Sequence, residues 1–588
     1  MYFLRSIQSE SRQNLRYSYR FLSYIAYAYF SIVGWSTEAS AEPAGDMIAI
    51  NEDLEKFNER FLKPELVQVA PGVHAARNYS YSNFSFIEGK TGWILIDTGW
   101  FEPGFADALK AIKRISGKPI SAIILTHNHE DHTGGGELAV ESAVPNVPIY
   151  AIANFGRQRE YDAGPMRLLI QKRNFAQTGL ALDELKGTRR GVSVGPMPEI
   201  GIRREVIPNI YISQDTTTVI DGVKLRLIPG GSDVSENLMI YMPDAGVLFS
   251  GDIVGGVYPY IETPRYEPRR DPRAWIDTLT VAMSLKPRAV VSGHGRIMQG
   301  AEDSRETLAA NREIIEYTVD QVERMLLEGY SAEQIVHEFR LPDHLKNNPD
   351  LQPYYHKIDW VLRGLIAKRV GYYTAPIDLF RLDGVSESAR IVALAGGKDV
   401  VLQTARNALG SGDARWAAHL SEYLLNLDAN DPAAKEIWAA SLDAIARETT
   451  SINERNYALT EAGIARGRID LDERVRSGMA EGAKGLSNGP LLFAFKSRFR
   501  AEDVKEGEEL CASISIDGKP SGYYEISGTV LRYDDQPMCS PRSSIMMSRE
   551  TLIDLYSGAL TWQDGLQKNI LTVKGNAGSV RKFSRLMD

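Results

Sequence analysis

Three histidines and two acidic residues fall within one six-residue run, His127-Asn128-His129-Glu130-Asp131-His132. Buried imidazoles and carboxylates need polar partners, so a cluster of this kind is rarely part of an apolar core. On a tight turn, such side chains could converge from two sides on two cations about 3.5–4 Å apart. Imidazole and carboxylate ligands without thiolate favour zinc, with manganese and iron as weaker candidates. The run therefore predicts a two-metal site whose ligands include His127, His129, Asp131 and His132.

Other acidic and histidine residues stand at equivalent places further along the chain. Each one follows an apolar, strand-like stretch directly or within three residues, as the histidine run itself does: Asp97, Asp252 and His294. In folds that contain sheets, functional side chains usually lie just past the ends of strands. Asp97, Asp252 and His294 therefore each stand where such a fold usually carries functional side chains.

The histidine run has the pattern HxHxDH followed by glycines, and it resembles the signature of the metallo-β-lactamase superfamily. In this resemblance Asp97 corresponds to a structural landmark, Asp252 to the carboxylate that bridges two metals, and His294 to the last ligand. The superfamily usually has another histidine between His132 and Asp252, and this chain has none there. The resemblance implies an α/β fold of the αββα sandwich type and a metal-dependent hydrolase with two Zn²⁺ per chain.

An acidic residue fills the position of the missing histidine. The segment 229–237 contains Asp233, which falls at the expected position when counted back from Pro243, and Glu236 is the second candidate. A carboxylate at this position resembles one branch of the superfamily, the alkyl sulfatases. We therefore expect Asp233 to share a metal with His127 and His129.

The resemblance to alkyl sulfatases extends over nearly the whole chain and implies its division into domains. Residues 42–303 correspond to the catalytic domain and residues 304–447 to an all-α dimerisation domain, which implies a homodimer. Residues 448–480 are assigned to a linker, and residues 481–588 to a small α+β, sterol-carrier-like domain. Within these regions, residues 331–334 have the pattern of a helical capping box, and residues 512–530 have that of a β-hairpin.

The same resemblance assigns roles around the metals. Four residues are expected to contact a small amphipathic alkyl sulfate: Arg265, Tyr258, Tyr260 and Arg173. Those expected to act in catalysis are Asp131, Asp252 and Arg265. A guanidinium stays charged and can bind two oxygens of a sulfate at once. For Arg270, a surface ion pair with Glu262 or Glu267 remains an equal alternative to a role in the site.

Two other functions fit parts of the sequence. A hydrolase of the same fold that cleaves a lactone, a thioester or a phosphodiester would have the same metal ligands. A non-catalytic lipid-binding scaffold would not need the ligand set at all. Bound metal would distinguish an enzyme from a scaffold, and release of inorganic sulfate would distinguish a sulfatase from the other hydrolases.

Composition limits the possible partners. The 588 residues carry a net charge of −9, which argues against nucleic-acid binding, and 43% hydrophobic with 24% charged residues is typical of a globular protein. Residues 1–41 combine four arginines, an apolar run and a small-residue site, which predicts a signal peptide and a secreted or periplasmic protein. A buried or interfacial helix is the alternative, and the run is too short for a stable membrane span.

The chain has two cysteines, Cys511 and Cys539. In an exported protein they could form a disulfide, but two unrelated thiols are an equally good interpretation of the sequence.

Overall fold

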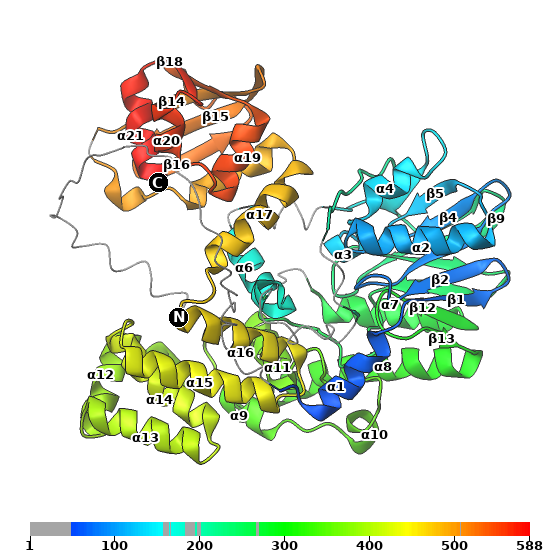
Figure 1. Cartoon of the computed structure of the whole chain (residues 1–588), viewed down its shortest axis with the longest axis horizontal. Coiled ribbons are helices and arrows are strands. Elements are labelled where there is room, and N and C mark those ends of the chain that lie inside the picture. The colour runs from blue at the N-terminus through cyan, green and yellow to red at the C-terminus, as the bar shows by residue number, and fades with distance from the viewer. Residues whose placement is uncertain are drawn as a thin grey trace, which may run out of the picture. The chain divides into compact units, whose positions relative to one another are not determined.

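The computed structural model describes residues 49–156, 164, 166–182, 195–196, 201–265, 270–505 and 507–588 (Figure 1). The expected signal peptide, residues 1–41, lies outside this part of the chain. Residues 47–588 form one compact unit.

Two sheets form the first part of this unit. The first has seven strands in sequence order: β1 (Glu65–Ala70), β2 (Val73–Arg77), β3 (Phe84–Glu88), β4 (Trp93–Ile96), β5 (Ile120–Ile124), β6 (Ile149–Ile152) and β7 (Ile210–Ile212). The second has the order β13 (Met298–Gln299), β12 (Ala289–Ser292), β11 (Val247–Gly251), β10 (Asn237–Met242), β9 (Val223–Gly230) and β8 (Thr216–Ile220). Strands β4 to β7 are parallel, as are β11 and β12.

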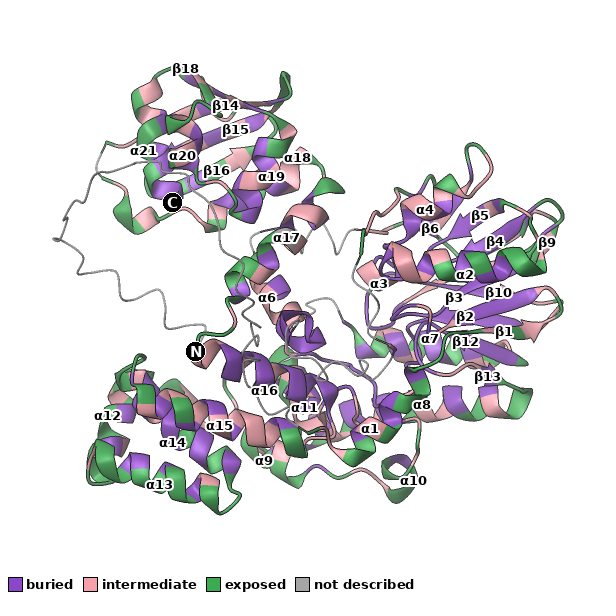
Figure 2. Ribbon diagram, in the orientation of Figure 1, coloured by how far each residue is buried: buried purple, intermediate pink, exposed green. Residues whose placement is uncertain are grey.

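Alternating side chains explain how these sheets pack. In β4, Ile94 and Ile96 enter a core shared with β9, β10 and β11, whereas Trp93 and Leu95 enter another core on the opposite face. The second core contains side chains of α2 (Glu102–Ile115) and α4 (Gly136–Glu141). Helices α7 (Pro272–Ser284) and α8 (Ala301–Leu327) cover the outer face of the second sheet. The layers are therefore helix, sheet, sheet and helix, as expected, with both sheets largely buried (Figure 2).

The helical region after the second sheet contains two packing groups. Helices α8, α9 (Ala332–Glu338), α10 (Asp343–Lys346) and α11 (Ile358–Val370) share a core with α7. Helices α12 (Gly384–Leu394), α13 (Lys398–Gly410), α14 (Ala414–Leu427) and α15 (Pro432–Glu448) have a core of their own. The expected capping box is present at the start of α9, with Ser331 and Gln334 as its members.

Residues 448–480, which we assigned to a linker, are packed structure. They form α16 (Ile452–Ala465) and most of α17 (Leu471–Lys484). Leu471, Val475 and Met479 recur every four residues and are buried in the core of the C-terminal module, by which we mean residues 481–588. On α16, the Asn456 amide donates a hydrogen bond to the carbonyl of Gln177 in α6 (Arg167–Thr178). The linker assignment is therefore wrong, because this segment carries its own apolar stripe.

The C-terminal module contains a five-stranded mixed sheet. Its order is β16 (Val530–Asp534), β15 (Lys519–Ser527), β14 (Leu510–Ile516), β17 (Ser543–Met547) and β18 (Thr572–Gly575). Four helices complete it: α18 (Asn488–Ala494), α19 (Arg549–Ser557), α20 (Trp562–Gln567) and α21 (Ala577–Met587). The expected hairpin is formed by β14 and β15, with Asp517 and Gly518 both at positive φ in its turn. Cys511 and Cys539 form a disulfide.

Among the described residues, none of the helices combines the length and the apolar character needed to cross a membrane.

Candidate active site

The histidine run begins three residues after β5, and Asp97 prepares its geometry. Asp97 directly follows β4 and has a positive φ of 59°, an uncommon conformation for a residue other than glycine. One of its oxygens accepts a hydrogen bond from the Thr126 amide, and the other lies 2.8 Å from Nδ1 of His132. This contact directs Nε2 of His132 toward the other ligands, as carboxylates next to metal-binding histidines commonly do.

The first candidate ligand group consists of His127, His129, Asp233 and Asp252, whose ligand atoms all lie within 4.8 Å of one another. Asp233 follows β9, and its Oδ2 is 3.5 Å from Nδ1 of His129. Asp252 directly follows β11, and its Oδ2 is 3.8 Å from Nε2 of His127. Glu236 is buried but is not a member of this group. The structure thus brings Asp233, rather than Glu236, to the histidines.

The second group consists of Asp131, His132 and His294. Nε2 of His294 lies 3.2 Å from an oxygen of Asp131 and 3.2 Å from Oδ2 of Asp252. Nε2 of His132 lies 3.4 Å from the other Asp252 oxygen. Asp252 therefore stands between the two groups, where a bridging carboxylate would stand.

The residues present fit a pair of zinc ions. Each group offers imidazole nitrogens and carboxylate oxygens at a spacing that one cation can span, and no thiolate takes part. Gly293 gives two of these ligands the space that they occupy. A Cβ at Gly293 would collide with Oδ1 of Asp252 and would stand 2.8 Å from Cε1 of His132.

The pKa shifts of His127 and His294 also fit a site for metal ions. Burial lowers the pKa of His127 to about 4, which keeps this imidazole neutral and able to bind a metal. Burial also lowers the pKa of His294, but the carboxylates of Asp252 and Asp131 outweigh that effect and raise it to about 10. The carboxylates thus create a strongly negative potential that dications would neutralise.

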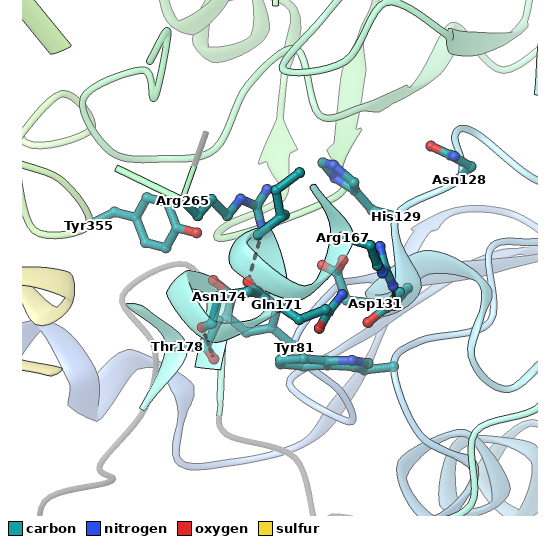
Figure 3. Close-up of a pocket in the computed structure, with 13 residues that line it drawn as sticks. Tyr81, Asn128, His129, Asp131, Arg167, Gln171, Asn174, Thr178, Arg265 and Tyr355 are labelled. Carbon is teal, nitrogen blue, oxygen red and sulfur yellow. Dashed lines mark hydrogen bonds and ion pairs between the residues drawn. The ribbon is translucent and has the colours of Figure 1, made fainter. Parts of the chain in front are cut away.

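A pocket opens directly beside these groups. In Figure 3, Asn128, His129 and Asp131 lie on one side of it, and Arg265 and Tyr355 lie on the other. Helix α6 contributes a further wall with Arg167, Ile170, Gln171, Asn174 and Thr178. Glu130, Tyr81 and Trp100 complete the lining. The Arg265 guanidinium donates a hydrogen bond to Oδ1 of Asn174, at 3.2 Å.

The other expected substrate contacts do not line this pocket. The Tyr258 hydroxyl lies 2.7 Å from Oγ1 of Thr318 inside the core, so Tyr258 is a packing residue. The Tyr260 hydroxyl donates to Oδ2 of Asp252 at 3.4 Å, which places it beside the ligands. The Arg173 guanidinium donates to the carbonyl of Pro264, next to Arg265. Of the four residues, Arg265 alone is part of the pocket lining.

For two features of the site, the sequence did not give the contacts that the structure shows. Glu130 forms ion pairs with Arg167 of α6 and with Arg203, which holds the histidine run against the pocket wall. Arg270 is fully buried and pairs with Asp233, so the surface ion pair considered for it is wrong. The only signal that could have revealed Arg270 is its place five residues after Arg265, directly before the helix cap Asp271.

Comparison with known proteins agrees with this geometry. Residues 77–294 match the family described as metallo-beta-lactamase superfamily, and residues 331–467 match the family described as alkyl sulfatase dimerisation. A linear primary-alkylsulfatase from Pseudomonas sp. is 30% identical over 392 residues, which cover 66% of this chain and 74% of that protein. An alkyl/aryl-sulfatase from Saccharomyces cerevisiae is 25% identical over 538 residues, which cover 89% of this chain and 82% of that protein.

The fold also has a solved counterpart. The structure of a stereoselective inverting sec-alkylsulfatase from Pseudomonas sp. superposes with a TM-score of 0.79 at 22% identity, covering 93% of this chain and 88% of that one. That likeness concerns the fold. The 30% identical relative and the two family matches show that this chain belongs to the alkyl sulfatase family of the metallo-β-lactamase superfamily.

Proposed function

We propose that this protein hydrolyses sulfate esters of alkyl alcohols to the alcohol and inorganic sulfate, with two zinc ions as cofactors. The observation that carries the proposal is the pocket in which Arg265 stands across from His129 and Asp131. A site for an anionic ester needs a fixed positive charge opposite the nucleophile, and a guanidinium supplies it at every accessible pH. The names of the relatives, which are alkylsulfatases, support the same substrate class.

Arg265 is close enough to the ligand groups to act on a substrate held there. The pKa of His129 is lowered well below its usual value, first by burial and then by interactions with His127 and with the positive charge of Arg265. Asn174 holds the guanidinium from α6. The guanidinium would therefore contact the non-bridging sulfate oxygens, while Ile170, Trp100 and Tyr355 offer apolar surface for an alkyl chain.

The ligand groups prepare the water. Bound zinc would supply Lewis acidity and lower the pKa of water from about 15.7 toward about 7. Asp97 fixes the orientation of His132, and Asp252 holds the two groups at a constant spacing. Burial of Asp252 and His132 keeps bulk water away from the ligands and strengthens every electrostatic interaction in the site.

The substrate class can be tested with product analysis in isotope-labelled water. We expect release of inorganic sulfate from dodecyl sulfate, and the position of the label will show whether the S–O or the C–O bond is cleaved. Asp252→Asn, which removes the carboxylate between the groups, should abolish the release. Efficient cleavage of a lactone, thioester or phosphodiester without sulfate release would contradict the proposal.

We also propose that the protein is a homodimer formed through its helical region. This region matches a family described by its dimerisation. The segment between α11 and α12 also exposes large apolar side chains, with exposed fractions of 78% for Tyr372, 63% for Ile377 and 73% for Phe380. A second copy that covers this segment would remove apolar surface from water.

Export is the remaining proposal, with residues 1–41 as the signal peptide. The Cys511–Cys539 disulfide supports it, because such bonds persist mainly in oxidising compartments. Mass spectrometry of protein from the periplasm or medium should find a chain that begins near residue 42. Full-length protein confined to the reducing cell interior would contradict export.

A further inference from the structure

Arg270 contacts Asp233, a member of the first ligand group. Its side chain is 1% exposed. Because charged side chains are almost never buried without a partner, contacts that compensate this charge are expected. All three guanidinium nitrogens are used. Nε donates to the backbone carbonyl of Asp233 at 2.6 Å, Nη2 lies 3.3 Å from the Asp233 carboxylate, and Nη1 donates to the carbonyl of Tyr260.

These contacts fix both the backbone and the side chain of Asp233. Because the same guanidinium binds the carbonyl and the carboxylate of Asp233, it fixes the loop and the side-chain direction together. The Ser232 hydroxyl donates to the other carboxylate oxygen at 3.1 Å. The Asp233 carboxylate is thereby aimed at His129, 3.5 Å away.

The charges also match. Asp233 is 2% exposed and adds a negative charge to a group that otherwise holds two imidazoles and one carboxylate. A buried charge is costly unless a partner compensates it, and a neutral ligand such as histidine at this position would need no partner. Arg270 supplies one positive charge at hydrogen-bond range.

We propose that Arg270 is the positioning residue that makes Asp233 a ligand of the metal shared with His127 and His129. It orients the carboxylate and compensates its charge, and it touches neither substrate nor metal. The same guanidinium lies over the Tyr260 ring at 5.3 Å, and the Tyr260 hydroxyl reaches Asp252. Arg270 therefore also supports the residue beside the bridging carboxylate. This inference rests on the proposed metal centre but not on the substrate.

Zinc affinity tests the proposal without any substrate. Metal-free protein is titrated with zinc against a chromophoric chelator, so that the two dissociation constants are resolved. Arg270→Met should weaken one of the two sites by about ten- to a hundred-fold and leave the other nearly unchanged, the usual effect of losing a residue behind a ligand. Arg270→Lys should fall in between, since it keeps the charge and loses the planar fork. Arg273→Met is the control: this exposed side chain lies in the first turn of α7, three residues after Arg270, and pairs with Glu323 of α8, so its loss should change neither constant.

A second background separates this role from simple packing. In Asp233→His the ligand is neutral, so Arg270 has no carboxylate to hold and its buried charge is uncompensated. There, adding Arg270→Met should leave zinc binding unchanged or tighten it. This comparison also applies if Arg270→Met alone does not fold.

Two results would overturn the proposal. One is a loss of zinc affinity in Arg270→Met that is equal at both sites, or no loss at either. The other is a tenfold loss on adding Arg270→Met to Asp233→His. Failure of the wild-type protein to release sulfate would refute the proposed substrate and leave these metal measurements standing.

Discussion

At the scale of single residues, Arg265 is the side chain that should bind the sulfate group and so select sulfate esters as substrates. Arg265→Lys keeps the positive charge but loses the two-pronged contact with sulfate and the hydrogen bond to Asn174. Losing a charged hydrogen bond costs about 1.5–3 kcal/mol, so kcat/KM for dodecyl sulfate should fall roughly ten- to a hundred-fold. Zinc content should not change. Wild-type turnover of dodecyl sulfate by Arg265→Lys would exclude this residue as the sulfate clamp.

His356 should make stability depend on pH. It is fully buried, and burial first, then the charges of Arg270 and Arg265, hold its pKa well below the usual value. Below about pH 6.5 the unfolded chain therefore binds a proton that the folded chain does not. Folding stability should fall as the pH drops below that value, by at most about 1.4 kcal/mol per pH unit.

Urea unfolding between neutral and mildly acidic pH measures this effect. His356→Gln should lose the part of the pH dependence that His356 causes, whereas His344→Gln, at an exposed histidine paired with Glu313, should retain it. An identical pH dependence in the wild type and His356→Gln would refute the assignment.

The sequence predicted metal-site residues best where the pattern is local. The ligands of the histidine run are adjacent in the chain, and Asp233 could be placed by counting residues from a strand end. Tyr258 was placed wrongly and the role of Arg270 was left open, because burial decides what both residues do. Tyr258 meets Thr318 of a helix 60 residues later, and Arg270 meets a loop 37 residues earlier. No spacing within the chain reports such contacts.

At the scale of elements, the disulfide should stabilise the C-terminal module. Cys511 lies on β14, and Cys539 lies 28 residues later, before β17. Closing a loop of this length typically contributes about 2–4 kcal/mol. Reduction should therefore lower the free energy of unfolding of this module by that amount, as measured in denaturant with and without reductant.

Cys511→Ser/Cys539→Ser provides the matched control. This variant should be less stable than the oxidised wild type and should not respond to reductant. A reductant effect of equal size in both proteins would show that the disulfide is not its cause.

Strands β4, β5, β11 and β12 followed from apolar runs, because nearly all of their side chains are buried on both faces. The linker assignment failed for a related reason. The stripe of Leu471, Val475 and Met479 is diluted by charged neighbours, so the sequence did not show that it packs against the C-terminal module. Whether the two cysteines pair was also undecidable, since pairing depends on how the chain folds back between β16 and β17.

At the scale of the whole molecule, the exposed apolar segment before α12 should be the dimer contact. Light scattering should give about twice the mass of one mature chain. A single mature chain is roughly 61 kDa, if about 110 Da is subtracted for each residue of the signal peptide. Phe380→Asp, at a side chain that is 73% exposed, should shift the protein toward monomer without loss of fold. Val219→Asp, 66% exposed on edge strand β8 of the second sheet, is the control. A wild-type monomer would contradict the homodimer.

Zinc-dependent sulfate release tests the central claim most directly. Metal-free protein is titrated with zinc, and the initial rate of sulfate release from dodecyl sulfate is measured at each ratio of zinc to chain. We expect no activity without metal and a rise that ends at two zinc ions per chain, because two ligand groups share Asp252. In His129→Ala and Asp252→Asn, zinc should restore neither full binding nor activity. Full sulfate release by the metal-free protein would contradict the claim.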